Sequence, residues 1–322
     1  MTEQTVDRLD GESNPRSQWG DIWRQFKKHR GALIGAIVFG AIVLGVLVGP
    51  LIYRHDAQYV PPVVEMIKLR DHRPVYTLLW DSSAKVNWSH PLGTDNLARD
   101  QLARLMVGGQ VSLAVGVVAM LLSLLVGTLI GVLAGYFKRL DGPLMRLTDL
   151  FLALPILPLL LVAVLLFREP LKAVFGVEGG IFVLIVALVG VTSWMQTARI
   201  VRGDVLALKE REFVLAARSI GTTDRRLVTR HILPNVMSPI MVSATLGIAS
   251  AIITESALSF LGFGFPPDFP TWGRLLFDAV DRMTLYPERV IWPGVAISVV
   301  VLSVNYIGDG LRDALDPRIR GR

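Results

Sequence analysis

The chain has 322 residues, of which 52% are hydrophobic, and its mean hydropathy is +0.50. Apolar runs of about 20 residues recur along it, which excludes an ordinary soluble protein because each run is long enough to cross a bilayer. The net charge of +6 does not indicate nucleic-acid binding, because the basic residues lie in short segments between these runs. The absence of cysteine excludes disulfides, thiolate metal sites and cysteine nucleophiles.

The N-terminal part is predicted to contain a polar tail, an interfacial helix and a first span. Residues 1–17 are polar and are expected to form a disordered cytoplasmic tail. Residues 18–53 begin with an apolar stripe flanked by basic residues, which predicts a helix lying in the headgroup region; the stripe is formed by Trp19, Ile22, Trp23 and Phe26. The apolar run that follows has no evident small-residue cleavage site, so we interpret it as a retained span and not as a signal peptide.

Residues 54–109 are too polar to lie in lipid and are predicted to form an extracytoplasmic region with some fold of its own. Charged residues gather near its end, at Asp95, Arg99 and Asp100. We expect a solvated turn with local salt bridges there, in preference to a ligand site.

Residues 110–310 are predicted to form the transmembrane core, followed by a cytoplasmic tail at 311–322. The sequence predicts five further spans, at residues 111–137, 147–167, 181–200, 236–265 and 290–308. Three glycines spaced four apart in the second span, Gly127, Gly131 and Gly135, give one smooth face that another helix can approach closely. The third span contains Pro155 and Pro158, which predict a kink. The expected fold is all-α, with six transmembrane helices.

The distribution of lysine and arginine predicts the orientation of these spans. Basic residues are concentrated before the first span, in the second and fourth connections (the latter at 202–235) and in the tail. The positive-inside rule therefore places both termini and the 202–235 loop on the cytoplasmic side.

The segment of residues 211–235 is polar and basic although it lies between two apolar spans. In its first half Phe213, Ala217 and Ile220 recur at helical spacing, which predicts a short amphipathic helix. Gly221 is expected to end that helix, because glycine adopts the left-handed conformation without steric cost. The Thr-Thr-Asp sequence that follows is expected to cap a second helix. The prediction is a helix, a sharp turn and a second helix at the membrane surface.

This segment resembles the signature loop of ABC-importer permeases, whose pattern is Glu-Ala-Ala, three residues, Gly, nine residues, Ile, one residue, Leu-Pro. Leu215 stands where Glu is usual, and His231 stands where Ile is usual. The resemblance implies that the loop docks into a groove of an ATPase subunit through the residues in register, Ala216, Ala217, Gly221, Leu233 and Pro234. The alternative is an ordinary pair of interfacial amphipathic helices.

Two further segments are similar to those of dipeptide and oligopeptide permeases, namely HPLGTDNLARDQLARLMVGGQVSL before the second span and ESALSFLGFGFPP at the end of the fifth. In that family a glycine often stands where Ala98 is. The resemblance implies a bacterial inner-membrane permease that forms half of a pathway for peptides. It also implies three kinds of partner: a second related permease, two cytoplasmic ATP-binding subunits and an external substrate-binding protein. The alternatives are a permease for nickel chelates or other small solutes, and an ion-coupled carrier.

The sequence offers no enzyme site of its own. No lysine follows a glycine, so the chain lacks a GxxxxGK[ST] phosphate-binding loop and ATP hydrolysis is expected in separate subunits. The five histidines are scattered without zinc-binding spacing, and no cofactor, metal or catalytic residue is expected. Glu255 is a candidate pathway or subunit-interface residue because it is an intramembrane carboxylate. Asp149 is expected to be a first-turn acid, and Asn305 is expected to bond a neighbouring helix.

The predicted topology is testable by cysteine labelling of the intact cell. Labels introduced after residues 80 and 225 should be reached from opposite sides of the membrane, because an odd number of spans separates the two positions. Labelling of both positions from the same side would contradict the six-span arrangement.

Overall fold

A computed structural model describes residues 18–315, so the predictions made for residues 1–17 and 316–322 lie outside the described residues. The described chain contains helices and connecting segments but no β-strand. Its elements are α1 (Gln18–Lys28), α2 (Arg30–Ile52), α3 (Val63–Leu69), η1 (Val75–Leu79), α4 (Gln101–Tyr136), α5 (Lys138–Ala153), α6 (Ile156–Phe175), α7 (Val177–Leu208), α8 (Glu212–Ser219), α9 (Asp224–Leu227), η2 (Val228–Ile232), η3 (Leu233–Val236), α10 (Met237–Phe260), α11 (Trp272–Val280) and α12 (Glu288–Leu315).

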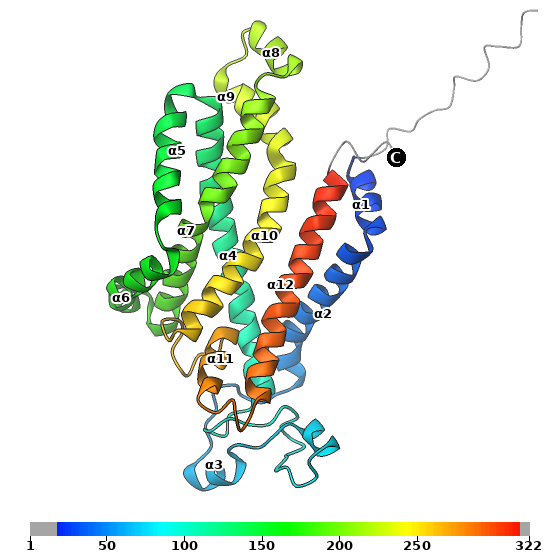
Figure 1. Cartoon of the computed structure of the whole chain (residues 1–322), viewed down its shortest axis with the longest axis vertical. Helices are drawn as coiled ribbons and strands as arrows, with labels where there is room; N and C mark the ends of the chain where they lie inside the picture. The colour runs from blue at the N-terminus through cyan, green and yellow to red at the C-terminus, as the bar shows by residue number, and fades with distance from the viewer. Residues whose placement is uncertain (1–17, 316–322) are drawn as a thin grey trace, which may run out of the picture.

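The long helices run roughly side by side, with α8 at one end of the bundle and α3 at the other (Figure 1). We call these the α8 end and the α3 end. Both α1 and the last turn of α12 lie at the α8 end. In the described chain, five helical runs are long and apolar enough to cross a membrane, namely α2, α4, α7, residues 224–260 and α12, and the bent pair α5–α6 brings the number to six. The predicted all-α membrane fold is therefore confirmed.

The expected third span at 147–167 is not one continuous helix. It is split between α5 and α6, whose axes meet at 89°. The break falls at Leu154, which is extended, and Pro155, which has no N–H to donate. A proline also disfavours the helical conformation of the residue before it, so this pair turns the chain sharply.

Two expected loops contain helix. The loop expected at 168–180 is helical except around Gly176, whose φ of +77° separates α6 from α7. The loop expected at 266–289 contains α11, which Thr271 caps by accepting a hydrogen bond from the Arg274 backbone N–H at 3.1 Å. These two connections thus contain more helix than the sequence predicts.

Helices α4 and α7 pack closely along the predicted glycine face. A Cβ atom added at Gly127 would lie 2.7 Å from the Trp194 carbonyl oxygen, and one at Gly131 would lie 2.7 Å from the Ala198 carbonyl oxygen. At Gly135 the same atom would meet Val205 at 2.7 Å. The small residues let the two backbones touch, as the four-residue spacing predicts.

Ion pairs tie the 54–109 region to the helices at the α3 end. Arg282 and Arg289 both donate to Asp71 at 2.9 Å, and Arg73 donates to Glu288 at 3.0 Å. These pairs connect residues that are more than 200 positions apart in the sequence. The region is therefore fixed on the bundle by charge pairing.

The turn expected to be solvated is buried. Asp95 is 3% exposed and accepts from Arg99 at 2.7 Å and from Arg104 at 2.8 Å; Arg104 also donates to Asp278 on α11 at 3.0 Å. Charges are buried where they are paired and hydrogen-bonded, and this turn pairs with a second segment that sequence reasoning did not bring near. Within it Ala98 has a φ of +59°, a conformation that favours glycine.

Substitution of Gly131 tests the α4–α7 contact. Gly131→Val should lower the free energy of unfolding by about 1–3 kcal/mol, because the added atoms overpack a helix crossing. Thermal unfolding of the purified chain in detergent measures the effect. The matched control is Gly203→Val on α7, where an added Cβ meets nothing within 4 Å. Equal unfolding temperatures for the two variants would show that the contact is not close.

Candidate functional site

The segment of residues 211–235 forms the predicted helix, turn and second helix at the α8 end (Figure 1). Helix α8 ends at Ser219, and Gly221 follows with a φ of +82°. The Thr222 backbone N–H then donates to the Ala217 carbonyl at 3.2 Å, and that of Gly221 donates to the Arg218 carbonyl at 3.0 Å. The chain therefore reverses where glycine was expected to end the helix.

The second half of the segment differs from the prediction in how it begins. Thr223 is the N-cap of α9, but its side chain makes no capping hydrogen bond. Asp224 instead accepts a hydrogen bond from the Tyr136 hydroxyl at the end of α4. After α9 the helix passes through one π turn and one 3₁₀ turn before α10. Pro234 lies in the 3₁₀ turn, so it accompanies a change of helix type and not an end of helix.

A small apolar cluster holds the two halves of the segment together. Its buried members are Val214 and Ala217 from α8 and Leu227 from α9. Ala217 is thus directed into the segment, whereas Ala216 is exposed. The two alanines were expected to share one docking surface, but only Ala216 is on the surface of the segment.

Large apolar side chains are exposed on the outer side of this segment. Ile220 is 84% exposed next to the turn, and Phe213 is 45% exposed in the first turn of α8. Leu215, in the position where Glu is usual, is also exposed. Sequence reasoning assigned Phe213 and Ile220 to an apolar stripe without stating that they face outward. Their place in an otherwise basic loop could have indicated this exposure, because such a loop offers few apolar side chains to bury them against.

The segment is fixed to the bundle at both of its ends. Arg218 donates to the Tyr136 hydroxyl at 3.4 Å, and Lys209 donates to the Gly135 carbonyl at 3.1 Å. At the other end Leu233 packs against buried Ile232 and Val236, in a cluster that includes residues of α4 and α7. The last turn of α4 therefore carries the segment.

A cavity of about 230 Å³ lies within the bundle between α4, α7 and α10, beside the α5–α6 break. None of its lining residues is charged, and seven carry hydroxyl groups: Ser123, Thr192, Ser193, Thr197, Ser243, Ser250 and Thr254. Gln196 adds an amide, and Leu152 and Ile156 line the cavity from either side of the break. The lining offers neutral hydrogen-bond donors and acceptors to a solute without imposing a charge.

Glu255 lies at the α3 end of α10 and is fully buried within the chain. Its carboxylate accepts from Ser259 at 2.8 Å and from Ser112 of α4 at 3.1 Å. Ser112 in turn accepts from the Trp272 backbone N–H of α11 at 3.2 Å. Glu255 therefore joins three helices, and in this structure it faces neither the cavity nor an exposed surface.

Two other polar residues differ from their expected roles. Asp149 lies in the last two turns of α5, not in its first, and pairs with Arg199 of α7. Asn305 was expected to bond a neighbouring helix, but no hydrogen bond joins its side chain to another described residue of the chain. Asp149 thus connects the broken span to α7.

Two substitutions of Glu255 test whether it stabilises the fold by accepting hydrogen bonds or only by filling space. Glu255→Leu should lower the free energy of unfolding by about 1–3 kcal/mol or more, because buried serine hydroxyls lose their acceptor. Glu255→Gln retains an acceptor oxygen and should cost less. Denaturation of the purified chain in detergent measures both, and equal losses would contradict a role as hydrogen-bond acceptor.

Comparison with known proteins identifies the family. Residues 127–321 match the binding-protein-dependent transport system inner membrane component family, and residues 17–63 match the N-terminal transmembrane domain of oligopeptide transport permease C. The chain is 36% identical to the oligopeptide transport system permease protein OppC of Bacillus subtilis (strain 168), over 94% of this chain and 91% of that protein. It is 37% identical to the glutathione transport system permease protein GsiD of Escherichia coli O6:K15:H31, over 95% and 92%.

The fold has a solved counterpart. An inward-facing structure of the MetNI methionine ABC transporter aligns with a TM-score of 0.53 at 17% identity, covering 66% of this chain and 96% of that one. This likeness supports the fold, while the relatives above support the family. The chain therefore belongs to the family of binding-protein-dependent transport system inner membrane components, as an inner-membrane ABC permease with several membrane-spanning helices.

Proposed function

We propose that this permease forms half of a translocation pathway for di- and oligopeptides, and that an external binding protein delivers them. One observation carries the proposal: Tyr136 connects the exposed apolar segment at the α8 end to α4, which lines the hydroxyl-rich cavity. A partner that moves the segment therefore moves a wall of the cavity. The chain itself is a non-catalytic transport subunit, with ATP hydrolysed by two separate subunits.

The proposed cargo follows from the relatives and agrees with the cavity lining. Relatives at 35–36% identity are named as oligopeptide and dipeptide permeases, and others are named as glutathione permeases. All three cargoes carry amide groups, which hydroxyl side chains bond in either direction. A neutral lining also accepts peptides with side chains of either charge. These points favour peptides over nickel chelates.

The proposed orientation places the α8 end in the cytoplasm and the α3 end outside. The exposed apolar side chains of the 211–235 segment then face the ATP-binding subunits, as in the family loop that it resembles. Ile220 and Phe213 supply apolar contact area, and Gly221 supplies the turn between the two helices. Ala216 lies on the exposed side of α8, whereas Ala217, Leu233 and the Tyr136 hydrogen bonds keep the segment rigid.

A second, related permease is proposed as the other half of the pathway. Gln196 and Ser250 line the cavity yet are exposed in the single chain, so the cavity is open at one side. Closure of that side requires another protein surface within the membrane. The second permease is proposed to be a related chain and not an identical copy.

Reconstitution tests the proposed cargo. The complete complex, in proteoliposomes with its cognate binding protein, should take up labelled di- or oligopeptides when ATP is supplied. An ion gradient without ATP should give no uptake. Uptake of nickel chelates with no uptake of peptides would overturn the peptide assignment, and uptake driven by an ion gradient would overturn the ABC mechanism for this chain.

Substitution of Ile220 tests docking without disturbing the chain. Ile220→Asp should abolish co-purification of the ATP-binding subunits and reduce transport to background, because a charge enters an apolar contact while the exposed side chain costs the fold little. Leu285→Asp is the matched control, since Leu285 is 69% exposed at the α3 end. Leu215→Glu restores the residue usual in the family and should leave both readouts near normal. Normal co-purification and transport by Ile220→Asp would remove this segment from the coupling role.

A further inference from the structure

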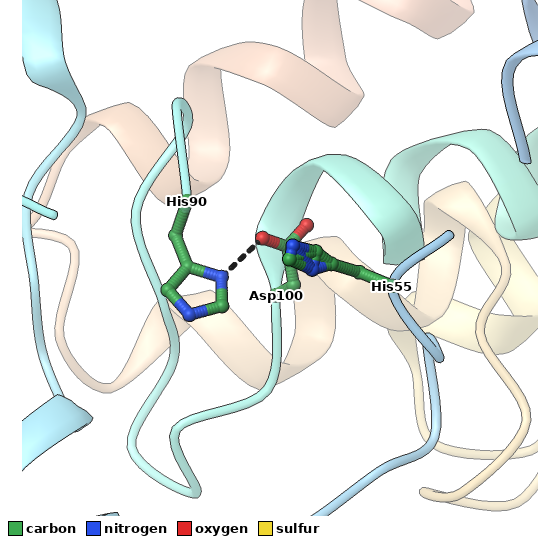
Figure 2. Close-up of side chains that lie close together, drawn as sticks. All are labelled: His55, His90 and Asp100. Carbon is green, nitrogen blue, oxygen red and sulfur yellow. Dashed lines mark hydrogen bonds and ion pairs between the residues drawn. The ribbon is translucent and has the colours of Figure 1, made fainter. Parts of the chain in front are cut away.

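Three residues from separate parts of the chain converge at the α3 end (Figure 2). His55 follows α2, His90 lies in the loop before α4, and Asp100 is the N-cap residue of α4. One potential ligand atom from each residue lies within 4.8 Å of those of the other two. Their sequence positions show no metal-binding spacing, which is why the sequence analysis did not group them.

The Asp100 carboxylate is held in place by its neighbours. Its Oδ1 accepts from the Ala103 backbone N–H at 2.6 Å, and its Oδ2 lies 2.7 Å from the Tyr53 hydroxyl. The same hydroxyl also lies 2.8 Å from the Ser89 carbonyl oxygen. Hydrogen bonds of this kind orient the ligands of metal sites in proteins.

The two imidazoles supply the other donor atoms. His90 Nδ1 lies 2.6 Å from Asp100 Oδ2. The His55 ring is tilted against Tyr53, with 4.4 Å between ring centroids, and lies 5.1 Å from the His90 ring, also tilted. No hydrogen bond joins the His55 ring nitrogens to another described residue. Both histidines and Asp100 line one pocket of about 290 Å³, which leaves room for water at open coordination positions.

We propose that His55, His90 and Asp100 bind one divalent transition-metal ion of the Zn²⁺ class. Two imidazole nitrogens and one carboxylate oxygen form a three-ligand set that Zn²⁺ uses in sites with an open position. Ligand atoms around tetrahedral Zn²⁺ lie ~3.3 Å apart, given bonds of about 2.0–2.1 Å. His90 Nδ1 and Asp100 Oδ2, now 2.6 Å apart, would therefore have to move apart by less than about 1 Å to bind the ion. The ion would join the end of α2 to the start of α4.

Metal binding by the full-length chain, purified in detergent without a polyhistidine tag, tests the site. Competition for Zn²⁺ with a chromophoric chelator should give one ion bound per chain. Loss of an outer-shell partner weakens metal affinity by about 10–100-fold, so His55→Ala, His90→Asn and Asp100→Asn should each weaken it at least as much. Asp100→Asn retains a helix N-cap residue, which limits the cost to folding. Ca²⁺ should not compete, because imidazole ligands select transition metals.

Two controls separate ligands from neighbours. His29→Asn at the α8 end removes a histidine but keeps a capping side chain, and it should leave Zn²⁺ affinity unchanged. Tyr53→Phe removes only an outer hydrogen bond and should have an intermediate effect. The unfolding temperature should rise with Zn²⁺ in the parent chain and not in His55→Ala. No Zn²⁺ uptake by the parent chain, or unchanged affinity in both histidine variants, would overturn the proposal and leave a hydrogen-bonded cluster.

Discussion

The contact between α4 and α7 is the constraint on which the rest of the structure depends. It places Gly127, Gly131 and Gly135 directly against the backbone of α7. A membrane gives helices little hydrophobic drive to associate, so close packing of small residues has to supply it. With the two helices fixed, Ser123 of α4 and Thr197 of α7 line one cavity, and Tyr136 at the end of α4 bonds Asp224 of the 211–235 segment. The cavity and this close helix contact thus share one interface.

Periodicity and composition predicted the features that depend on neighbouring residues in the chain. The apolar runs identified the spans, the glycine repeat identified the α4–α7 face, and Gly221 identified a turn that the structure has at φ +82°. The break at Pro155, where the sequence predicts a kinked but continuous span, is a feature that local patterns do not determine. A proline inside an apolar run allows either a kink or a break, and the sequence alone does not distinguish the two outcomes.

Long-range charge pairing explains the other departures. Asp95 was expected to be in water because the sequence around it is polar, yet it is buried and pairs with Arg104, which also pairs with Asp278. Asp278 lies 183 positions further along the chain, on a helix that the sequence did not predict. The exposure of Ile220 is a similar case, because helical spacing identifies an apolar face without stating what covers it. Burial is a property of the assembled chain, whereas periodicity is local.

The size of the cavity limits what one chain can do alone. Pockets that enclose drug-sized ligands have volumes of about 300–1,000 Å³, whereas this cavity has about 230 Å³ and is open beside Gln196 and Ser250. A peptide larger than a few residues therefore does not fit within the walls of α4, α7 and α10. A second permease that faces this opening would both enlarge the space and remove the lipid from it. The 211–235 segment of each chain would then move one wall, so that a pathway of two half-cavities would open and close through two connections of the kind that Tyr136 makes here.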